Sequence, residues 1–355
     1  MPQSEIQNID SSPNEAFAAV PDSKSNSMEQ GITMRAKGLK LPSISVESMQ
    51  IVALIAIITI LAISMQINND RFLSAANLKV MTVNFIPEAI MALGMTIVMI
   101  SGGIDISIAG VLLICGIVVG MLMNAGLPVP IAIVLTLCLA GFIGFINITM
   151  ANLFKVHPFL SSLSLLLLLR GLSLVITGGA TVSGFPDSFK FLGQETIFGI
   201  PTQIVLFAVL AITIGYLLKN HRFLQQAYFI GGNRRSARMS GIKVERFLIF
   251  AFVLNGILAG IAGIVTASKF GAASVSFGQN AELRVIAAVA LGGASFTGGT
   301  GTILGTALGI FFLALIYNAF AMTGVNTYWQ DVAIGAMLMI AVFLGEYLKK
   351  RQIAR

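Results

Sequence analysis

Six ionisable residues stand inside, or at the edges of, long apolar stretches of this 355-residue sequence. They are Glu88, Asp105, Arg170, Glu282, Arg284 and Asp331. In such surroundings a charged group faces a protein interior or water, where it binds a solute or ion, forms an ion pair or caps a helix. Glu282 and Arg284 are two positions apart, so they do not face each other on a helix. Arg170 has Glu88 or Asp331 as candidate partners, and the sequence does not choose between them.

Asp105 stands in the segment SGGIDISIAG, residues 101–110. Gly102 and Gly103 permit a tight bend, and an aspartate directly after it accepts hydrogen bonds from the free N–H groups of a helix start. A second interpretation places Asp105 and Ser107 on a polar path for a hydroxylated solute. The candidate path residues are Asp105, Ser107, Glu282 and Asp331.

A second glycine cluster occupies residues 291–305, which contain six glycines. The pattern favours a bend, with close helix packing through small residues as the alternative. The bend glycines of the two clusters are Gly102, Gly103, Gly292, Gly293, Gly298 and Gly299. No G-x-x-x-x-G-K-[ST] motif is present, so the sequence predicts no ATP site of the P-loop kind.

The longest basic segment is residues 219–246. Its seven Lys and Arg residues are Lys219, Arg222, Arg234, Arg235, Arg238, Lys243 and Arg246. Asn233 is a suitable N-cap and Gly241 a suitable left-handed residue after a helix, so we expect a helix of about two turns between them. Such a helix suits docking on another protein, and attraction to anionic lipid head groups is the competing explanation for its arginines.

Composition identifies the elements that position these residues. The chain is 56% hydrophobic and only 10% charged, against roughly 25% charged residues in soluble proteins. This predicts an all-α polytopic membrane protein with about ten spans. They lie near 47–66, 80–100, 104–123, 129–152, 158–177, 201–218, 247–268, 283–296, 303–322 and 327–347. The eighth is short and rich in glycine, as a broken helix would be.

The predicted organisation is a disordered cytoplasmic tail at 1–45, a transmembrane domain at 46–348 containing the loop 219–246, and a basic C-terminus at 349–355. With both termini inside, sixteen Lys and Arg residues fall on the cytoplasmic side and four outside, which agrees with the positive-inside rule. Ten spans divide into two halves of five, which would be inverted repeats. Residues 180–201 form the longest outside loop, either a plain connector or a surface for an external partner.

Three segments resemble the permease subunits of bacterial ATP-binding-cassette (ABC) importers for monosaccharides, of the ribose, xylose and arabinose type. They are SGGIDISIAG at 101–110, IGGNRRSARMSGI at 230–242 and ELRVIAAVALGGASFTGGTGTILGTALG at 282–309. The resemblance covers roughly residues 50–347. It departs from the family at Arg234-Arg235, where members commonly have smaller or acidic residues, which leaves the sugar and the ATPase partner open.

The resemblance implies a bacterial inner-membrane protein that binds no cofactor, with ATP and Mg²⁺ on a separate ATPase subunit. It also implies a second permease copy or paralogue, a periplasmic sugar-binding protein, a monosaccharide substrate and surrounding lipid, with no nucleic acid. The residues that it assigns to ATPase coupling are Gly231, Gly232, Asn233, Arg234, Arg235, Ala237, Arg238 and Gly241.

Other functions stay open on different grounds. An ion-coupled secondary transporter would use a carboxylate such as Glu88, Asp105 or Asp331, and a permease for branched-chain amino acids would share the general layout. We expect no catalytic residues, because no histidine–carboxylate or Ser/His pair stands at helical spacing. We expect no metal site either, because His157 and His221 are the only two histidines and neither has a companion ligand.

Overall fold

The computed structural model describes residues 46–326 and 328–353, and the burial of side chains at 49–326 and 328–343. The chain from Ile44 onward forms one unit, and only its described residues are discussed below. The predicted tail at 1–45 lies outside the described residues. The predicted basic C-terminus belongs in part to the last helix, which continues to Ile353.

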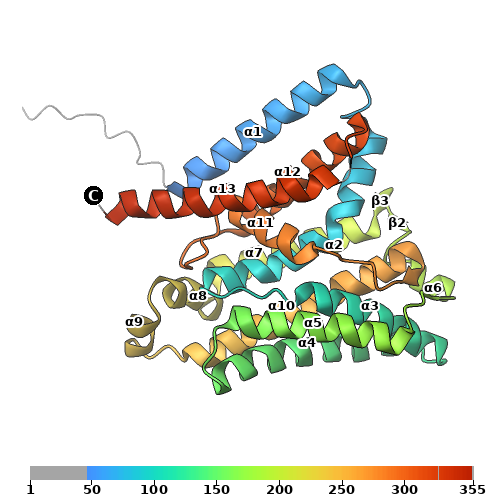
Figure 1. The fold of residues 1–355 in the computed structure, drawn as a ribbon, viewed down its shortest axis with the longest axis horizontal. Helices are drawn as coiled ribbons and strands as arrows, with labels where there is room; N and C mark the ends of the chain where they lie inside the picture. The colour runs from blue at the N-terminus through green and yellow to red at the C-terminus, as the bar shows by residue number, and fades with distance from the viewer. Residues whose placement is uncertain (1–45, 327, 354–355) are drawn as a thin grey trace, which may run out of the picture. The chain divides into compact units, whose positions relative to one another are not determined.

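The described residues are mostly helical with very little strand, as the sequence predicts (Figure 1). The helices are α1 (Val46–Asn68), α2 (Ala75–Ile100), α3 (Ile108–Asn124), α4 (Val129–Leu153), α5 (Pro158–Thr177), α6 (Asp187–Lys190), α7 (Thr202–Asn220), α8 (Arg222–Gly232), α9 (Arg234–Met239), α10 (Val244–Phe270), α11 (Ala281–Leu291), α12 (Ile303–Thr323) and α13 (Tyr328–Ile353). The strands are β1 (Val182–Ser183), β2 (Thr196–Ile197), β3 (Ile200–Pro201) and β4 (Ala272–Ala273).

Seven helices in the described part of the chain are long and apolar enough to cross a membrane: α1, α2, α4, α5, α7, α10 and α12. The other three predicted spans fall on α3, α11 and α13. Helix α3 has 17 residues and α11 has 11. The predicted span at 283–296 is therefore a half-length helix followed by the second glycine cluster. The all-α polytopic class is confirmed, and the number of crossings stays a prediction.

Helices α2 and α10 pack on each other and carry most of the contacts between elements. In Figure 1 they lie between α1, α12 and α13 on one side and α3, α4 and α5 on the other. Helix α10 packs on α3 and α4, while α2 packs on α11 and α12. If α2, α3, α4 and α5 are matched in order with α10, α11, α12 and α13, the contacts of α10 with α3 and α4 correspond to those of α2 with α11 and α12. In the same way, the contacts of α3 with α4 and α5 correspond to those of α11 with α12 and α13. The contact of α4 with α5 has no comparable counterpart. The pattern supports two related halves, and their inverted sense stays a prediction.

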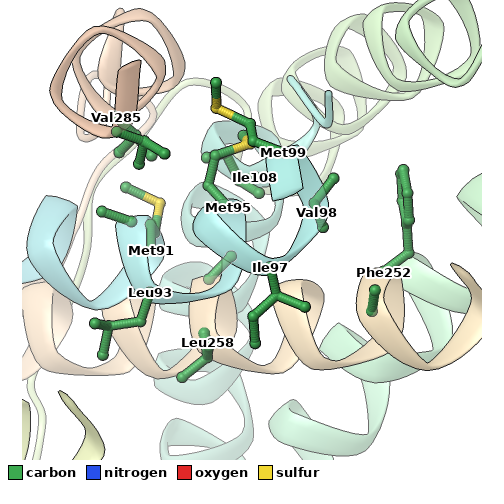
Figure 2. Packing of buried hydrophobic residues seen from close by; sticks show 14 of the residues in the cluster. Met91, Leu93, Met95, Ile97, Val98, Met99, Ile108, Phe252, Leu258 and Val285 are labelled. Carbon is green, nitrogen blue, oxygen red and sulfur yellow. The ribbon is translucent and has the colours of Figure 1, made fainter. Parts of the chain in front are cut away.

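The second half of α2 is the most deeply buried segment. From Ala89 to Ile100 every residue is buried. Figure 2 shows Met91, Met95 and Met99 of α2 among apolar side chains of neighbouring helices. A helix that is apolar all round is stable only when other elements surround it, and α7, α10, α11 and α12 do so here.

Small residues allow the central helices to approach closely. A Cβ atom on Gly263 of α10 would overlap the carbonyl oxygen of Leu112 in α3. A Cβ atom on Gly144 of α4 would overlap the carbonyl oxygen of Phe252 in α10. Backbone-to-backbone contact on two faces explains why α10 packs so extensively on α3 and α4.

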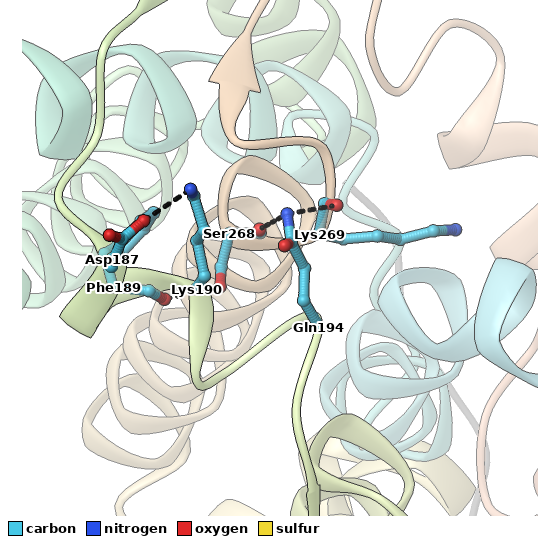
Figure 3. Close-up of polar contacts among 6 residues, drawn as sticks. All are labelled: Asp187, Phe189, Lys190, Gln194, Ser268 and Lys269. Carbon is cyan, nitrogen blue, oxygen red and sulfur yellow. Dashed lines mark hydrogen bonds and ion pairs between the residues drawn. The ribbon is translucent and has the colours of Figure 1, made fainter.

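The predicted outside loop is folded against the end of α10. Strand β1 pairs with β4 in antiparallel register, Val182 opposite Ala273. The Ser268 hydroxyl donates to the Phe189 carbonyl at 2.6 Å, and the Gln194 side chain donates to the carbonyl of Lys269 at 3.2 Å (Figure 3). The loop is therefore held by the body of the protein, except at the β2–β3 hairpin.

Candidate functional site

The basic loop folds into two short helices, α8 and α9. The Asn233 side chain accepts a hydrogen bond from the Ser236 N–H at 3.0 Å and so caps α9. Gly241 follows with a φ of +83°, the left-handed conformation that glycine adopts most readily. The predicted helix between Asn233 and Gly241 is confirmed.

Helix α8 was not predicted from the sequence. It lies directly before Asn233 and buries Leu224, Ala227 and Ile230. These three residues are spaced three apart and therefore share one face of a helix. That spacing indicates an amphipathic helix and could have predicted α8. The high charge of the surrounding loop made the pattern hard to recognise.

The end of α8 meets both glycine clusters. A Cβ atom on Gly231 would overlap both the Ile100 carbonyl oxygen and the Gly299 backbone nitrogen. The Gly299 N–H donates to that same Ile100 carbonyl at 2.8 Å. A Cβ atom on Gly298 would lie 2.8 Å from the Gly102 nitrogen and from the Gly231 Cα. We call this contact of Ile100, Gly102, Gly231, Gly298 and Gly299 the glycine junction.

The predicted bend glycines divide into two kinds. Gly102, Gly293, Gly298 and Gly299 have φ angles between +76° and +96°, which only glycine adopts readily. Gly103 and Gly292 do not have positive φ. A Cβ atom on Gly292 would overlap the Gly305 carbonyl of α12, so this glycine permits close packing.

The paired arginines have different surroundings. The Arg234 guanidinium donates to the Gly102 carbonyl at 3.1 Å, which ties α9 to the glycine junction. Partial desolvation of this exposed residue's guanidinium, together with the nearby charge of Arg238, lowers the pKa of Arg234. Arg238 forms an ion pair with Glu245 in the first turn of α10. Within the described chain, Arg235 is exposed and has no ion pair or side-chain hydrogen bond.

Two other residues of α9 have opposite exposure. The Ala237 side chain is buried and only 4% exposed, whereas Met239 is 82% exposed. Ala237, which the resemblance assigns to coupling, therefore packs α9 onto the body of the protein. Met239 is an apolar side chain on a polar surface, and its exposure was not predicted from the sequence.

Asp105 is the acceptor of a buried polar cluster. Its Oδ1 atom accepts from the Ser107 N–H, the Ser107 hydroxyl and the Asn147 amide at 3.0, 2.6 and 2.9 Å. Its Oδ2 atom accepts from the Asn255 amide at 3.0 Å. Because these donors come from the 101–107 segment, α4 and α10, the carboxylate links three elements. Only one of the four donors is a backbone N–H, that of Ser107, so Asp105 joins three segments rather than capping α3 as predicted. The solute-path interpretation stays a prediction.

Helix α11 carries two ion pairs to different helices. Arg170 of α5 contacts Glu282 at 3.0 Å, so neither partner suggested by the sequence is the one found. Arg284 contacts Glu88 of α2 at 2.9 Å, and both side chains are largely buried. Glu282 and Arg284 indeed point to different neighbours. The two pairs hold α11 between α5 and α2.

The candidate path residues are not joined in one polar site. Asp105 and Ser107 share one cluster, Glu282 is paired with Arg170, and Asp331 is exposed on α13. No hydrogen bond or ion pair among the described residues links these three locations. Across the same residues, no group of three His, Cys, Asp or Glu side chains is placed to hold a metal ion.

In the loop at 180–201, Asp187 of α6 pairs with Lys190 at 2.6 Å (Figure 3). The hydrogen bond from Lys190 and its charge lower the pKa of Asp187. This pair is a solvated feature of α6, and exposed pairs of this kind stabilise a fold little.

Comparison with known proteins gives a consistent result. The family described as "Branched-chain amino acid transport system / permease component" matches residues 77–342. The chain is 34% identical to the autoinducer 2 import system permease protein LsrC of Photorhabdus luminescens, over 83% of this chain and 89% of that protein. It is 31% identical to the ribose import permease protein RbsC of Haemophilus influenzae, over 84% of this chain and 94% of that protein. No solved structure matches significantly.

Proposed function

Because the chain belongs to the family of permease components of branched-chain amino acid type transport systems, we propose that it forms the membrane path for a monosaccharide in an ABC importer. It is a transporter subunit of the bacterial inner membrane and not an enzyme. The relatives named for ribose and for autoinducer 2 support a ribose-like sugar rather than an amino acid. Autoinducer 2 is the second candidate substrate.

The observation that carries the mechanism is the glycine junction. A separate ATPase docks on the exposed face of α9, which includes Arg235 and Met239. Movement of α9 passes through Asn233 to Gly231, which touches the end of α2 at Ile100 and the loop before α12 at Gly299. In this proposal, movement of the ATPase displaces both glycine clusters at the same time. ATP supplies the bias between the two states of the path, because only differential binding shifts an equilibrium.

On the opposite side we propose contact with a periplasmic sugar-binding protein. The tip of the β2–β3 hairpin presents Phe198, which is 99% exposed and has a φ of +51°. A fully exposed apolar side chain at the tip of a hairpin suits a docking contact. A second permease copy or paralogue completes the path in this proposal.

An ion-coupled secondary transporter is less consistent with the described contacts. Glu88 and Glu282 each have an arginine partner, and Asp105 accepts four hydrogen bonds. A carboxylate that binds and releases an ion with each cycle has to leave such partners. Of the carboxylates that the sequence places in or near the spans, Asp331 is the exposed one and is therefore the remaining candidate for binding an ion.

The function is tested in proteoliposomes that contain the permease, its co-purified ATPase and the external binding protein. We expect ATP-dependent uptake of labelled ribose, or of autoinducer 2 if that is the substrate, and no uptake of leucine. The control is the permease alone with a proton or sodium gradient, which should give none. Gradient-driven uptake without ATP would contradict the proposal, and leucine uptake would contradict the substrate class.

A further inference from the structure

A groove with a volume of about 870 Å³ lies between α7, α8 and the start of α12. It lies on the outer surface, since the side chains of Ile212, Tyr216 and Leu304 on its walls are 72%, 67% and 63% exposed. Its volume falls in the range of roughly 300–1,000 Å³ that is typical of ligand sites. Nothing in the proposed transport path uses this groove.

Along α7 the groove covers most of the thickness of one membrane leaflet. Along α7 its wall runs from Ala211 to Lys219, about 12 Å at the helical rise of roughly 1.5 Å per residue. Half of a bilayer's hydrocarbon is about 15 Å. Because α7 is long and apolar enough to span the membrane and its end leads into the basic loop, the groove opens to the cytoplasmic leaflet. The assignment of the groove to the cytoplasmic leaflet rests on the proposed orientation of the permease.

The walls are apolar and the cytoplasmic end is basic. Lys219 lines the groove at the end of α7, and the exposed Arg222 begins α8 three residues later. Neither side chain is among the ion pairs of the described residues, and no acidic residue lines the groove. An apolar slot beneath unpaired cations matches an acyl chain beneath a negatively charged head group.

We propose that this groove binds an anionic phospholipid, with one acyl chain between α7 and α12 and the phosphate at Lys219 and Arg222. The bound lipid contacts α8, whose last residues form the glycine junction, and the Thr302 cap of α12. It therefore stabilises the position of the coupling helices relative to α7. A second copy docked here by two-fold symmetry would bring like charges at Lys219 together, which is unfavourable.

The test measures lipid retained by the purified permease alone, in native mass spectra after addition of phosphatidylglycerol or phosphatidylcholine. We expect preferential retention of phosphatidylglycerol. Lys219→Glu should weaken it about fivefold or more, because one basic residue near an anionic head group contributes about that factor. Gly215→Leu should abolish it, because Gly215 lines the groove and a Cβ atom there would already be 3.6 Å from Ile303.

Matched controls are Lys243→Glu, in the same basic loop but outside the groove, and Gly171→Leu, on α5 where a Cβ atom meets open space. Both should retain lipid like the unaltered protein. Equal retention by the two groove variants, or equal retention of the two lipids, would overturn the proposal. So would loss of a dimer rather than of lipid in Gly215→Leu, which would assign the groove to a second copy. The assay contains no ATPase or sugar, so its failure leaves the transport function untouched.

Discussion

Gly231 and Gly232 are neighbours in α8 with opposite surroundings. A side chain on Gly231 would enter the glycine junction, whereas a Cβ atom on Gly232 has nothing within 4 Å. The resemblance to known importers groups the two glycines, and the structure separates them. At the residue scale, the coupling segment therefore depends on one glycine for close packing.

We predict that Gly231→Ala abolishes ATP-driven uptake and that Gly232→Ala leaves it near normal. The added methyl group at Gly231 has to displace the backbone at Ile100 or Gly299, an overpacking cost of about 1–3 kcal/mol. Uptake in membrane vesicles and the thermal midpoint of the purified protein measure the two effects. Full uptake by Gly231→Ala would remove the glycine junction from the mechanism.

At the element scale, two short helices are attached to the body in different ways. Helix α9 is held by buried Ala237, by the Arg234 bond to the Gly102 carbonyl and by the Arg238–Glu245 pair. Helix α11 is held by ion pairs on two of its sides. The exposed part of α9 is accessible to a partner protein, whereas the charged side chains of α11 are paired with α5 and α2.

For α9 we predict that Met239→Glu weakens co-purification of the ATPase and leaves the thermal midpoint unchanged. Met239 is 82% exposed, so a carboxylate there stays in water but disturbs an apolar contact. Ala237→Glu should lower both, because it places a charge at a buried position. Unchanged ATPase recovery with Met239→Glu would show that the partner docks elsewhere.

For α11 we predict that Arg284→Met destabilises the protein, by up to about 3–5 kcal/mol, because Glu88 keeps a largely buried charge without its partner. The paired exchange Arg284→Glu with Glu88→Arg should recover part of this loss. Thermal unfolding of each single variant and of the double variant gives the coupling. Additive losses in the double variant would mean that the pair contributes nothing of its own.

At the scale of the whole molecule, the described helices are arranged around α2 and α10. Leu93 of α2 is fully buried, while Leu135 of α4 is 46% exposed. In a membrane the lipid is as apolar as leucine, so packing rather than removal from water stabilises the buried positions. Stability should therefore be concentrated along α2 and α10.

We predict that Leu93→Ala lowers stability by about 2 kcal/mol or more through the cavity that it leaves. Leu135→Ala should change it little, because lipid fills the space. Thermal unfolding in one detergent compares the two variants directly. A similar loss at both positions would mean that the centre of the packing lies elsewhere.

The sequence alone determined the class of protein, the approximate position of most long helices and the capped helix after Asn233, but not α8 or the shortness of α11. These features depend on hydropathy, charge and capping, which act within a few residues of the chain. It also located both glycine clusters, and its assignment of the basic loop to the cytoplasmic side stays a prediction. Its family resemblance agrees with the relatives found.

Only the tertiary structure decided which of these pieces touch. It paired Arg170 with Glu282 and Arg284 with Glu88, and it surrounded Asp105 with donors from distant segments. It also brought Gly231 between Ile100 and Gly299. Several partners of suitable chemistry exist for each of these groups along the chain. The choice among them depends on which helices become neighbours, and that is a property of the packed fold.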